Sequence, residues 1–175
     1  MLQQLLQLAR TGIASEPLPD AAPQDVVAVT LHARILRILG RALTIRHVDA
    51  GSCNACELEI HALLNPYYNL EGAGIRFVAS PRHADLLLVT GPVSRHMAVA
   101  LQRTYDAMPE PRIVVAAGAC AGTGGIFGES YASLGRLSNV LPVNVEIPGC
   151  PPAPIALLQC IRAAISVSVP ESAPP

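Results

Sequence analysis

The stretch RIVVAAGACAGTGGIFG, residues 112–128, decides the fold of this chain. Its beginning, residues 112–117, predicts a buried strand, because a short continuous apolar run is typical of parallel strands covered on both faces. The glycine-rich remainder, residues 118–128, predicts a loop. A buried strand that runs into such a loop is the usual building unit of a parallel α/β sheet.

The segments on either side of this stretch alternate between strand and helix patterns. Short apolar runs predict strands, and longer amphipathic segments predict helices. The alternation predicts an α/β fold, a flavodoxin-like doubly wound parallel sheet with helices on both faces. In chain order the other predicted elements are a strand at 44–48, a helix at 54–64, strands at 75–79 and 85–90, a helix at 94–108, a strand at 143–147 and a helix at 154–167.

These elements define a predicted domain over residues 44–167. Residues 1–43 are expected to form an N-terminal helical extension with a Pro-rich linker, and residues 168–175 a disordered tail. Trp is absent and Phe occurs only twice, so the core is expected to consist of Leu, Val, Ile and Ala. Such a core suits a parallel sheet covered by helices.

Composition narrows the class of protein. The formal net charge of −1 argues against a nucleic-acid partner. No run reaches the roughly 18 apolar residues of a membrane span, and the start MLQQLLQLAR resembles neither a secretion signal nor a twin-Arg signal. We therefore expect a cytoplasmic protein with reduced cysteines and no transmembrane helix of its own. A hydrophobic content of 51% against 14% charged residues predicts that partner proteins cover part of the surface.

Four of the five cysteines follow predicted strands. Cys53 and Cys56 lie in DAGSCNACE after the first strand, Cys120 lies in AAGACAGTGG after the fourth, and Cys150 lies in EIPGCPPAP after the last. Loops that follow parallel strands converge at the carboxyl edge of the sheet. We therefore expect three loops that are distant in sequence to bring four thiolates together.

Four thiolates can hold either a [4Fe–4S] cluster or a tetrahedral zinc ion. Structural zinc is usually bound by two closely spaced cysteine pairs. This chain has one CxxC pair and two isolated cysteines. That pattern suits a cubane with one thiolate per iron. Unligated thiols with a dithiol redox pair are the third reading. The fifth cysteine, Cys160, lies on the last predicted helix and is interpreted as a packing residue.

Small and titratable residues surround the cysteines. Gly51, Gly118 and Gly149 are expected to bind the cofactor by letting the backbone turn tightly and approach it. Glu57 follows Cys56 directly, and it is interpreted as a proton relay, a subunit contact or an acid that completes a helix N-terminus. His47 is the histidine nearest to the first cysteine loop, and it is the one to test.

Three motifs, GSCNACELE, IVVAAGACAGTGGIFG and VEIPGCPPAPIALL, occur in this order within residues 44–165. Together they resemble the small subunit of [NiFe]-hydrogenases and its relative, the cluster-bearing B-type subunit of complex I. The complex I subunit carries two adjacent cysteines, whereas the hydrogenase subunit carries a CxxC, as this chain does. Ala55 stands where Gly is common in the hydrogenase motif. The lack of further ligand-rich segments after Cys150 resembles the short subunit of membrane-bound, energy-converting hydrogenases, including formate hydrogenlyase.

The resemblance implies one [4Fe–4S] cluster on Cys53, Cys56, Cys120 and Cys150. It implies electron transfer between ferredoxin-like subunits and the Ni–Fe site of a large subunit, where two protons and two electrons form H2, with no bond chemistry in this chain itself. Integral membrane subunits would hold the protein on the inner face of the cell membrane. Two other readings remain: a complex I-like subunit whose cluster reduces quinone, and a zinc-stabilised, non-enzymatic interaction module.

Overall fold

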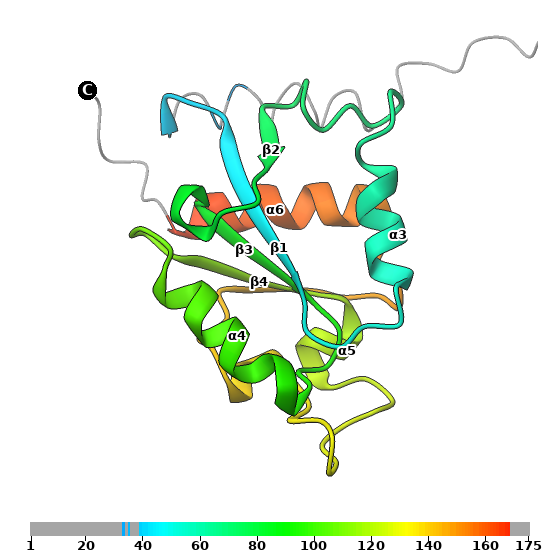
Figure 1. The fold of residues 1–175 in the computed structure, drawn as a ribbon. Helices are drawn as coiled ribbons and strands as arrows, with labels where there is room; N and C mark the ends of the chain where they lie inside the picture. The colour runs from blue at the N-terminus through cyan, green and yellow to red at the C-terminus, as the bar shows by residue number, and fades with distance from the viewer. Residues whose placement is uncertain (1–32, 34, 36–38, 169–175) are drawn as a thin grey trace, which may run out of the picture.

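The computed structural model describes residues 33, 35 and 39–168. These residues form a five-stranded parallel sheet in the order β2-β1-β3-β4-β5 (Figure 1). That order is the one found in flavodoxin-like doubly wound folds. The predicted fold class is therefore confirmed.

The strands and helices alternate along the chain, as the sequence predicts. In order they are β1 (Leu43–Asp49), α3 (Ala55–Ala62), β2 (Ile75–Phe77), the 3₁₀ turn η1 (Pro81–His83), β3 (Leu86–Thr90), α4 (Arg95–Asp106), β4 (Ile113–Ala117), α5 (Gly118–Thr123), the 3₁₀ turn η2 (Leu137–Asn139), β5 (Val145–Ile147) and α6 (Pro154–Ser168).

The glycine-rich segment is the main difference from the sequence prediction. The prediction of a loop over residues 118–128 is wrong for its first half, which forms the short helix α5. Alanines between the glycines supply helix propensity there, and the hydroxyl of Thr123 donates a hydrogen bond to the carbonyl of Ala119 at 2.9 Å. The helix ends at Gly124, whose φ of 89° is the left-handed conformation typical of a helix C-terminus.

Four other elements, β2, β5, α3 and α4, are shorter than predicted by two or three residues each. The edge strands β2 and β5 each have three residues, because each pairs with only one neighbour. Helix α3 ends at Ala62 rather than at residue 64. The backbone hydrogen bonds there change to the i→i−3 type, with the N–H of Leu64 donating to the carbonyl of His61 at 3.0 Å and that of Asn65 to the carbonyl of Ala62 at 3.2 Å.

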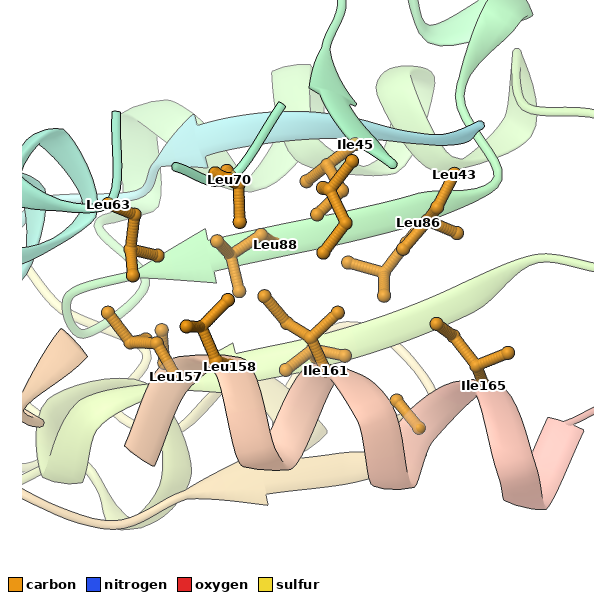
Figure 2. Close-up of a cluster of buried hydrophobic side chains, with 14 of the residues drawn as sticks. Leu43, Ile45, Leu63, Leu70, Leu86, Leu88, Leu157, Leu158, Ile161 and Ile165 are labelled. Atoms are coloured by element: carbon orange, nitrogen blue, oxygen red, sulfur yellow. The ribbon is translucent and has the colours of Figure 1, made fainter. Parts of the chain in front are cut away.

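The core lies on both faces of the sheet. Side chains alternate along β3, so Leu86 and Leu88 face one layer while Leu87 and Val89 face the other. Helices α3 and α6 cover the first face, and Figure 2 shows the aliphatic residues of α6 packed against β1 and β3. Helix α4 and part of α5 cover the second face. Two-sided burial explains why β3 and β4 appear in the sequence as continuous apolar runs.

The ends of the predicted domain extend into the flanking segments. Ile35, from the segment expected to precede the domain, is fully buried in the first core layer. Ser168, expected to begin the tail, lies in α6. The rest of the predicted N-terminal extension and the predicted tail fall largely outside the described residues. None of the helices in the described part of the chain combines the length and the apolar composition needed to cross a lipid bilayer.

Candidate metal centre

The four predicted ligand cysteines line one cavity at the carboxyl edge of the sheet. The cavity is shallow, with an enclosed volume of about 10 Å³, and Cys53 and Cys150 are exposed at its rim. Cys56 is buried and Cys120 is half-buried. The other lining residues are small: Ser52, Ala55, Gly91, Ala119, Gly149 and Pro151. The topology thus brings the three cysteine loops together as the sequence predicts.

Hydrogen bonds hold the first cysteine loop in place. The Oδ1 atom of Asp49, at the end of β1, accepts hydrogen bonds from the backbone N–H groups of Gly51 at 2.8 Å and Ser52 at 2.7 Å. The Ser52 hydroxyl accepts one from the N–H of Asn54 at 3.1 Å. Asn54 is left-handed, with a φ of 72°, and α3 begins directly after it. Cys53 therefore lies in a loop with defined geometry, and Cys56 lies in the first turn of α3 directly after it.

Glycine at two positions makes room for sulfur atoms. A Cβ atom on Gly118 would lie 2.8 Å from the Sγ of Cys56, and one on Gly125 would lie 2.8 Å from the Sγ of Cys120. Both glycines also have a positive φ. Side chains at these positions would push the cysteines away from the shared cavity.

Of the predicted cofactor-binding glycines, Gly149 lines the cavity, and Gly51 and Gly118 directly precede the lining residues Ser52 and Ala119. Gly51, Gly118 and Gly149 adopt φ values of 136°, 85° and 126°. The backbone N–H of Ala119 donates a hydrogen bond to the carbonyl of Gly149 at 2.7 Å. This bond joins the loop that carries Cys120 to the loop that carries Cys150.

The thiols disfavour one another's ionisation. Burial raises the pKa of the Cys56 thiol to about 11, and the negative charges of Glu57 and the other three cysteines contribute to the rise. Burial also raises the pKa of Cys120, together with Cys150 and Cys53. Four adjacent thiolates are stable only when a cation compensates their charge. The donor set therefore has the chemistry of a metal-binding site.

Four cysteine thiolates can hold either one metal ion or a cluster. Within residues 33, 35 and 39–168, no group of three or more His, Cys, Asp or Glu side chains is close enough together to hold a single metal ion. Around one zinc ion, four sulfur atoms at about 2.3 Å would have to touch each other. A cubane binds each thiolate through a different iron and so needs a wider set of ligands. The four cysteines share one cavity, and their sequence pattern of one CxxC and two lone cysteines suits a cubane with one thiolate per iron.

Glu57 belongs to a small polar network behind the cysteines. Its Oε2 atom accepts a hydrogen bond from the Ser52 hydroxyl at 2.7 Å, and its Oε1 atom lies 3.7 Å from the Nε2 of His47. Oε1 is buried and has no hydrogen-bond partner. The same His47 nitrogen is hydrogen-bonded to the Oγ1 of Thr90 at 3.0 Å. Burial lowers the pKa of His47, against the opposing effect of Glu57.

The sequence pattern did not single out three residues of this site. Gly91 lines the thiol cavity, Gly125 leaves room for the Cys120 sulfur, and Thr90 contacts His47. The position of Gly91 could have been predicted from the sequence, because Gly91 directly follows a predicted strand, as the cysteine segments do. Cys160 lies away from the cavity and packs against the core from α6, as its position in the sequence predicts.

Residues 53–164 match the family model described as "NADH ubiquinone oxidoreductase, 20 Kd subunit". The chain belongs to this family. The predicted resemblance is thus confirmed. Curated relatives in the family include subunits of two kinds of oxidoreductase complex, hydrogenases and quinone oxidoreductases, so the expected enzyme class is also confirmed.

Three relatives show the range of the family. The chain is 44% identical over 133 residues to the probable membrane-bound hydrogenase subunit mbhJ of Pyrococcus furiosus, covering 76% of this chain and 80% of that protein. It is 42% identical over 142 residues to formate hydrogenlyase subunit 7 of Escherichia coli K12, covering 81% and 55%. It is 48% identical over 118 residues to the B-type subunit of NADH-quinone oxidoreductase from Desulfovibrio desulfuricans, covering 67% and 63%. The chain therefore spans only about half of the formate hydrogenlyase subunit.

Solved structures share the fold. A chain of the membrane-bound sulfane sulfur reductase, an archaeal respiratory membrane complex, matches with a TM-score of 0.63 at 32% identity, covering 79% of this chain and 73% of that one. A chain of NAD⁺-reducing [NiFe]-hydrogenase matches with a TM-score of 0.56 at 19% identity, covering 74% and 96%. The match to the NAD⁺-reducing hydrogenase chain shows a shared fold only.

Proposed function

We propose that this chain is the electron-transfer small subunit of a membrane-associated [NiFe]-hydrogenase. In this proposal Cys53, Cys56, Cys120 and Cys150 hold one [4Fe–4S] cluster. The observation that carries the proposal is the meeting of these four cysteines, from three segments that follow β1, β4 and β5, at one cavity. The CxxC spacing of the first pair and the similarity to two hydrogenase subunits support the hydrogenase reading.

A [4Fe–4S] cluster supplies one-electron transfer at a potential that its surroundings set. The residues of this chain orient the thiolates, bring the small side chains and backbone close to the sulfur atoms, and keep one side of the site dry. Gly118 and Gly125 allow the close approach, and the buried side chain of Cys56 lies on the dry side. The exposed Cys53 and Cys150 leave the other side open to a partner.

An apolar surface near the site is the proposed docking area for the large subunit. Ile126, Phe127 and Tyr131 are exposed in the segment that follows α5, the helix of Cys120. Exposed large apolar side chains of this kind mark surfaces that partner proteins cover. The Ni–Fe site of the large subunit would then lie on the open side of the cysteines. Ferredoxin-like subunits and integral membrane subunits complete the proposed complex, at the inner face of the cell membrane.

We also propose that Glu57 relays protons next to the cluster. The support is its geometry: a buried carboxylate adjacent to Cys56, with one oxygen bonded to Ser52 and the other free to accept a proton. His47 is the neighbouring group that can exchange this proton, since its Nε2 atom lies 3.7 Å from Oε1. Proton and electron would then pass through neighbouring parts of the same loop.

A quinone-linked role is the second candidate. The observation in its favour is the 48% identity to the B-type subunit of an NADH-quinone oxidoreductase. The separated cysteines Cys53 and Cys56 argue against it, because the complex I subunit resembles this chain but carries an adjacent pair. Both candidates use the same cluster, and they differ in whether the partner subunit carries nickel.

The test is the metal content and activity of the complex purified anaerobically through this subunit. We expect iron, sulfide and nickel in the preparation, together with H2 evolution from an artificial reductant. Iron and sulfide without nickel or H2 evolution would favour the quinone-linked role. Zinc in place of iron would overturn the cluster assignment.

A further inference from the structure

A second cavity of about 340 Å³ lies behind the first cysteine loop. It shares no lining residue with the thiol cavity. Its volume is in the range of pockets that hold a ligand or an anchoring side chain. Residues from β1, from α3 with the turn after it, and from the end of β2 line it: Arg46, His47, Ile60, His61, Leu64, Phe77, Val78 and Ala79.

Arg46 is the unusual member of this lining. Its Nε atom is buried and has no hydrogen-bond partner, and its guanidinium makes no ion pair with any residue of the described chain. A guanidinium presents a planar set of donors that matches a carboxylate, and one left unpaired at a half-buried position is costly. The buried Nε–H donor of Arg46 therefore lacks an acceptor in the described chain.

The charge of the cavity is entirely basic. Arg46, His47 and His61 line it, and no carboxylate does. Burial lowers the pKa of His47, and the neighbouring Arg46 and His61 lower it further while Glu57 and Asp49 raise it. Arg46 is therefore the permanent cation of the cavity. A single carboxylate would satisfy it, whereas a neutral occupant would not.

The rest of the wall is apolar and continues onto the surface. Ile60 and Phe77 form part of the wall inside the cavity, and Leu64 stands half-exposed at its edge. Leu58, one helical turn before His61 on α3, is a further exposed apolar side chain. This surface is broader than a small carboxylate could cover, so it suits a segment of polypeptide.

We propose that this cavity anchors an Asp or Glu side chain carried within an apolar segment of a partner subunit. The carboxylate pairs with Arg46, and the apolar residues that flank it pack on Ile60, Leu64 and Phe77. The proposal rests on the proposed function only in that the chain works inside a multi-subunit complex. It identifies a second contact, made by residues other than those of the Ile126–Tyr131 surface.

The chain offers a clean chemical test, because its sequence contains no lysine. The variant Arg46→Lys keeps the positive charge and places one reactive amine in the cavity. The purified complex is treated with a carbodiimide, which joins amines to carboxylates in direct contact, and the products are mapped by mass spectrometry. We expect a crosslink from position 46 to an Asp or Glu in an apolar stretch of a co-purified subunit.

Arg76→Lys is the matched control. Arg76 is an exposed arginine on the adjacent strand β2, and it does not line the cavity. We expect no comparable crosslink from position 76. The proposal is overturned if position 46 couples only to carboxylates of this chain, to a small carboxylate molecule or to nothing, or if both positions couple equally.

A second variant keeps the test decisive if Arg46→Lys prevents assembly. With Arg46→Gln we expect the amount of partner subunit retained after a high-salt wash to fall at least about tenfold, because removing one member of a buried charge pair mainly speeds dissociation. Arg76→Gln should leave retention unchanged, and unchanged retention in both variants would overturn the proposal. Iron, sulfide and nickel measured in the same samples report separately on the proposed function.

Discussion

The two ends of the sheet differ in whether their carboxylate oxygens have hydrogen-bond partners. At the amino end, both carboxylate oxygens of Asp85 are used: the two amino groups of Arg41 donate to them at 3.0 Å and 2.6 Å, and the backbone N–H of Thr44 donates at 3.0 Å. At the carboxyl end, Glu57 accepts one hydrogen bond and leaves its other oxygen buried without a partner.

The difference separates structural groups from functional ones. Asp85 ties the start of β1 to the start of β3, and the chain itself supplies every partner it needs. The carboxyl end holds a half-satisfied Glu57 and thiols with raised pKa values, and Arg46, whose buried Nε atom lacks a partner, lies in the middle of β1. Buried polar groups are normally paired, so the unpaired ones indicate where a cofactor, a proton or a partner completes the site.

The largest expected effect comes from removing one cysteine of the thiol cavity. Cys120→Ser should lose the bound iron, because serine replaces the only thiolate that α5 contributes. Iron and sulfide per complex measure the loss. Cys160→Ser is the control, since this residue packs against the core from α6 and should leave iron content unchanged. Equal iron content in both variants would refute the ligand assignment.

Two glycines test whether the carboxyl end is shaped around sulfur. Gly125 and Gly128 both have a φ of 55°, so an alanine is equally strained at either position. Only at Gly125 would the new Cβ meet the Cys120 sulfur, at 2.8 Å, whereas nothing lies within 4 Å at Gly128. Gly125→Ala should therefore lose most of the iron while Gly128→Ala retains it. Matching losses would mean that backbone strain alone is responsible.

The half-satisfied carboxylate offers a test of proton transfer. Glu57→Gln keeps the shape of the side chain but cannot exchange a proton, so H2 evolution should fall on the order of 100-fold while iron content is preserved. Glu59→Gln, two residues further along α3, is the control and should keep its activity. Activity equal to that of the unmodified complex would remove Glu57 from the proposed relay.

The smallest effect is expected at the amino end of the sheet. Asp85→Ala removes the acceptor for Arg41 and Thr44, and should lower the free energy of unfolding by about 2 kcal/mol. Urea unfolding measures this change, with Asp106→Ala as an exposed control. Iron content should stay unchanged. A loss of iron would show that the two ends of the sheet are not independent.

The sequence predicts the central strands well because they are buried on both faces. The run at 113–117 can only be a covered strand, and its neighbour in the sheet, β3, has the same apolar character. The edge strands were predicted too long, since their ends are not paired on both sides and apolar content alone does not limit them. The sequence does not predict helix α5, because the glycines of this segment favour a loop more strongly than its alanines favour a helix.

The sequence alone determined the order of the five strands and of every helix except α5, and the position of the four cavity cysteines after strands. Local patterns suffice for these features, because burial periodicity and loop position depend on residues that are close together in the sequence. The tertiary structure decided which distant residues meet: Gly118 against Cys56, His47 against Glu57, and Arg46 in a cavity without a carboxylate. Such contacts depend on strand register and on how each helix packs on the sheet, and these arise from the sum of all core contacts rather than from any single segment.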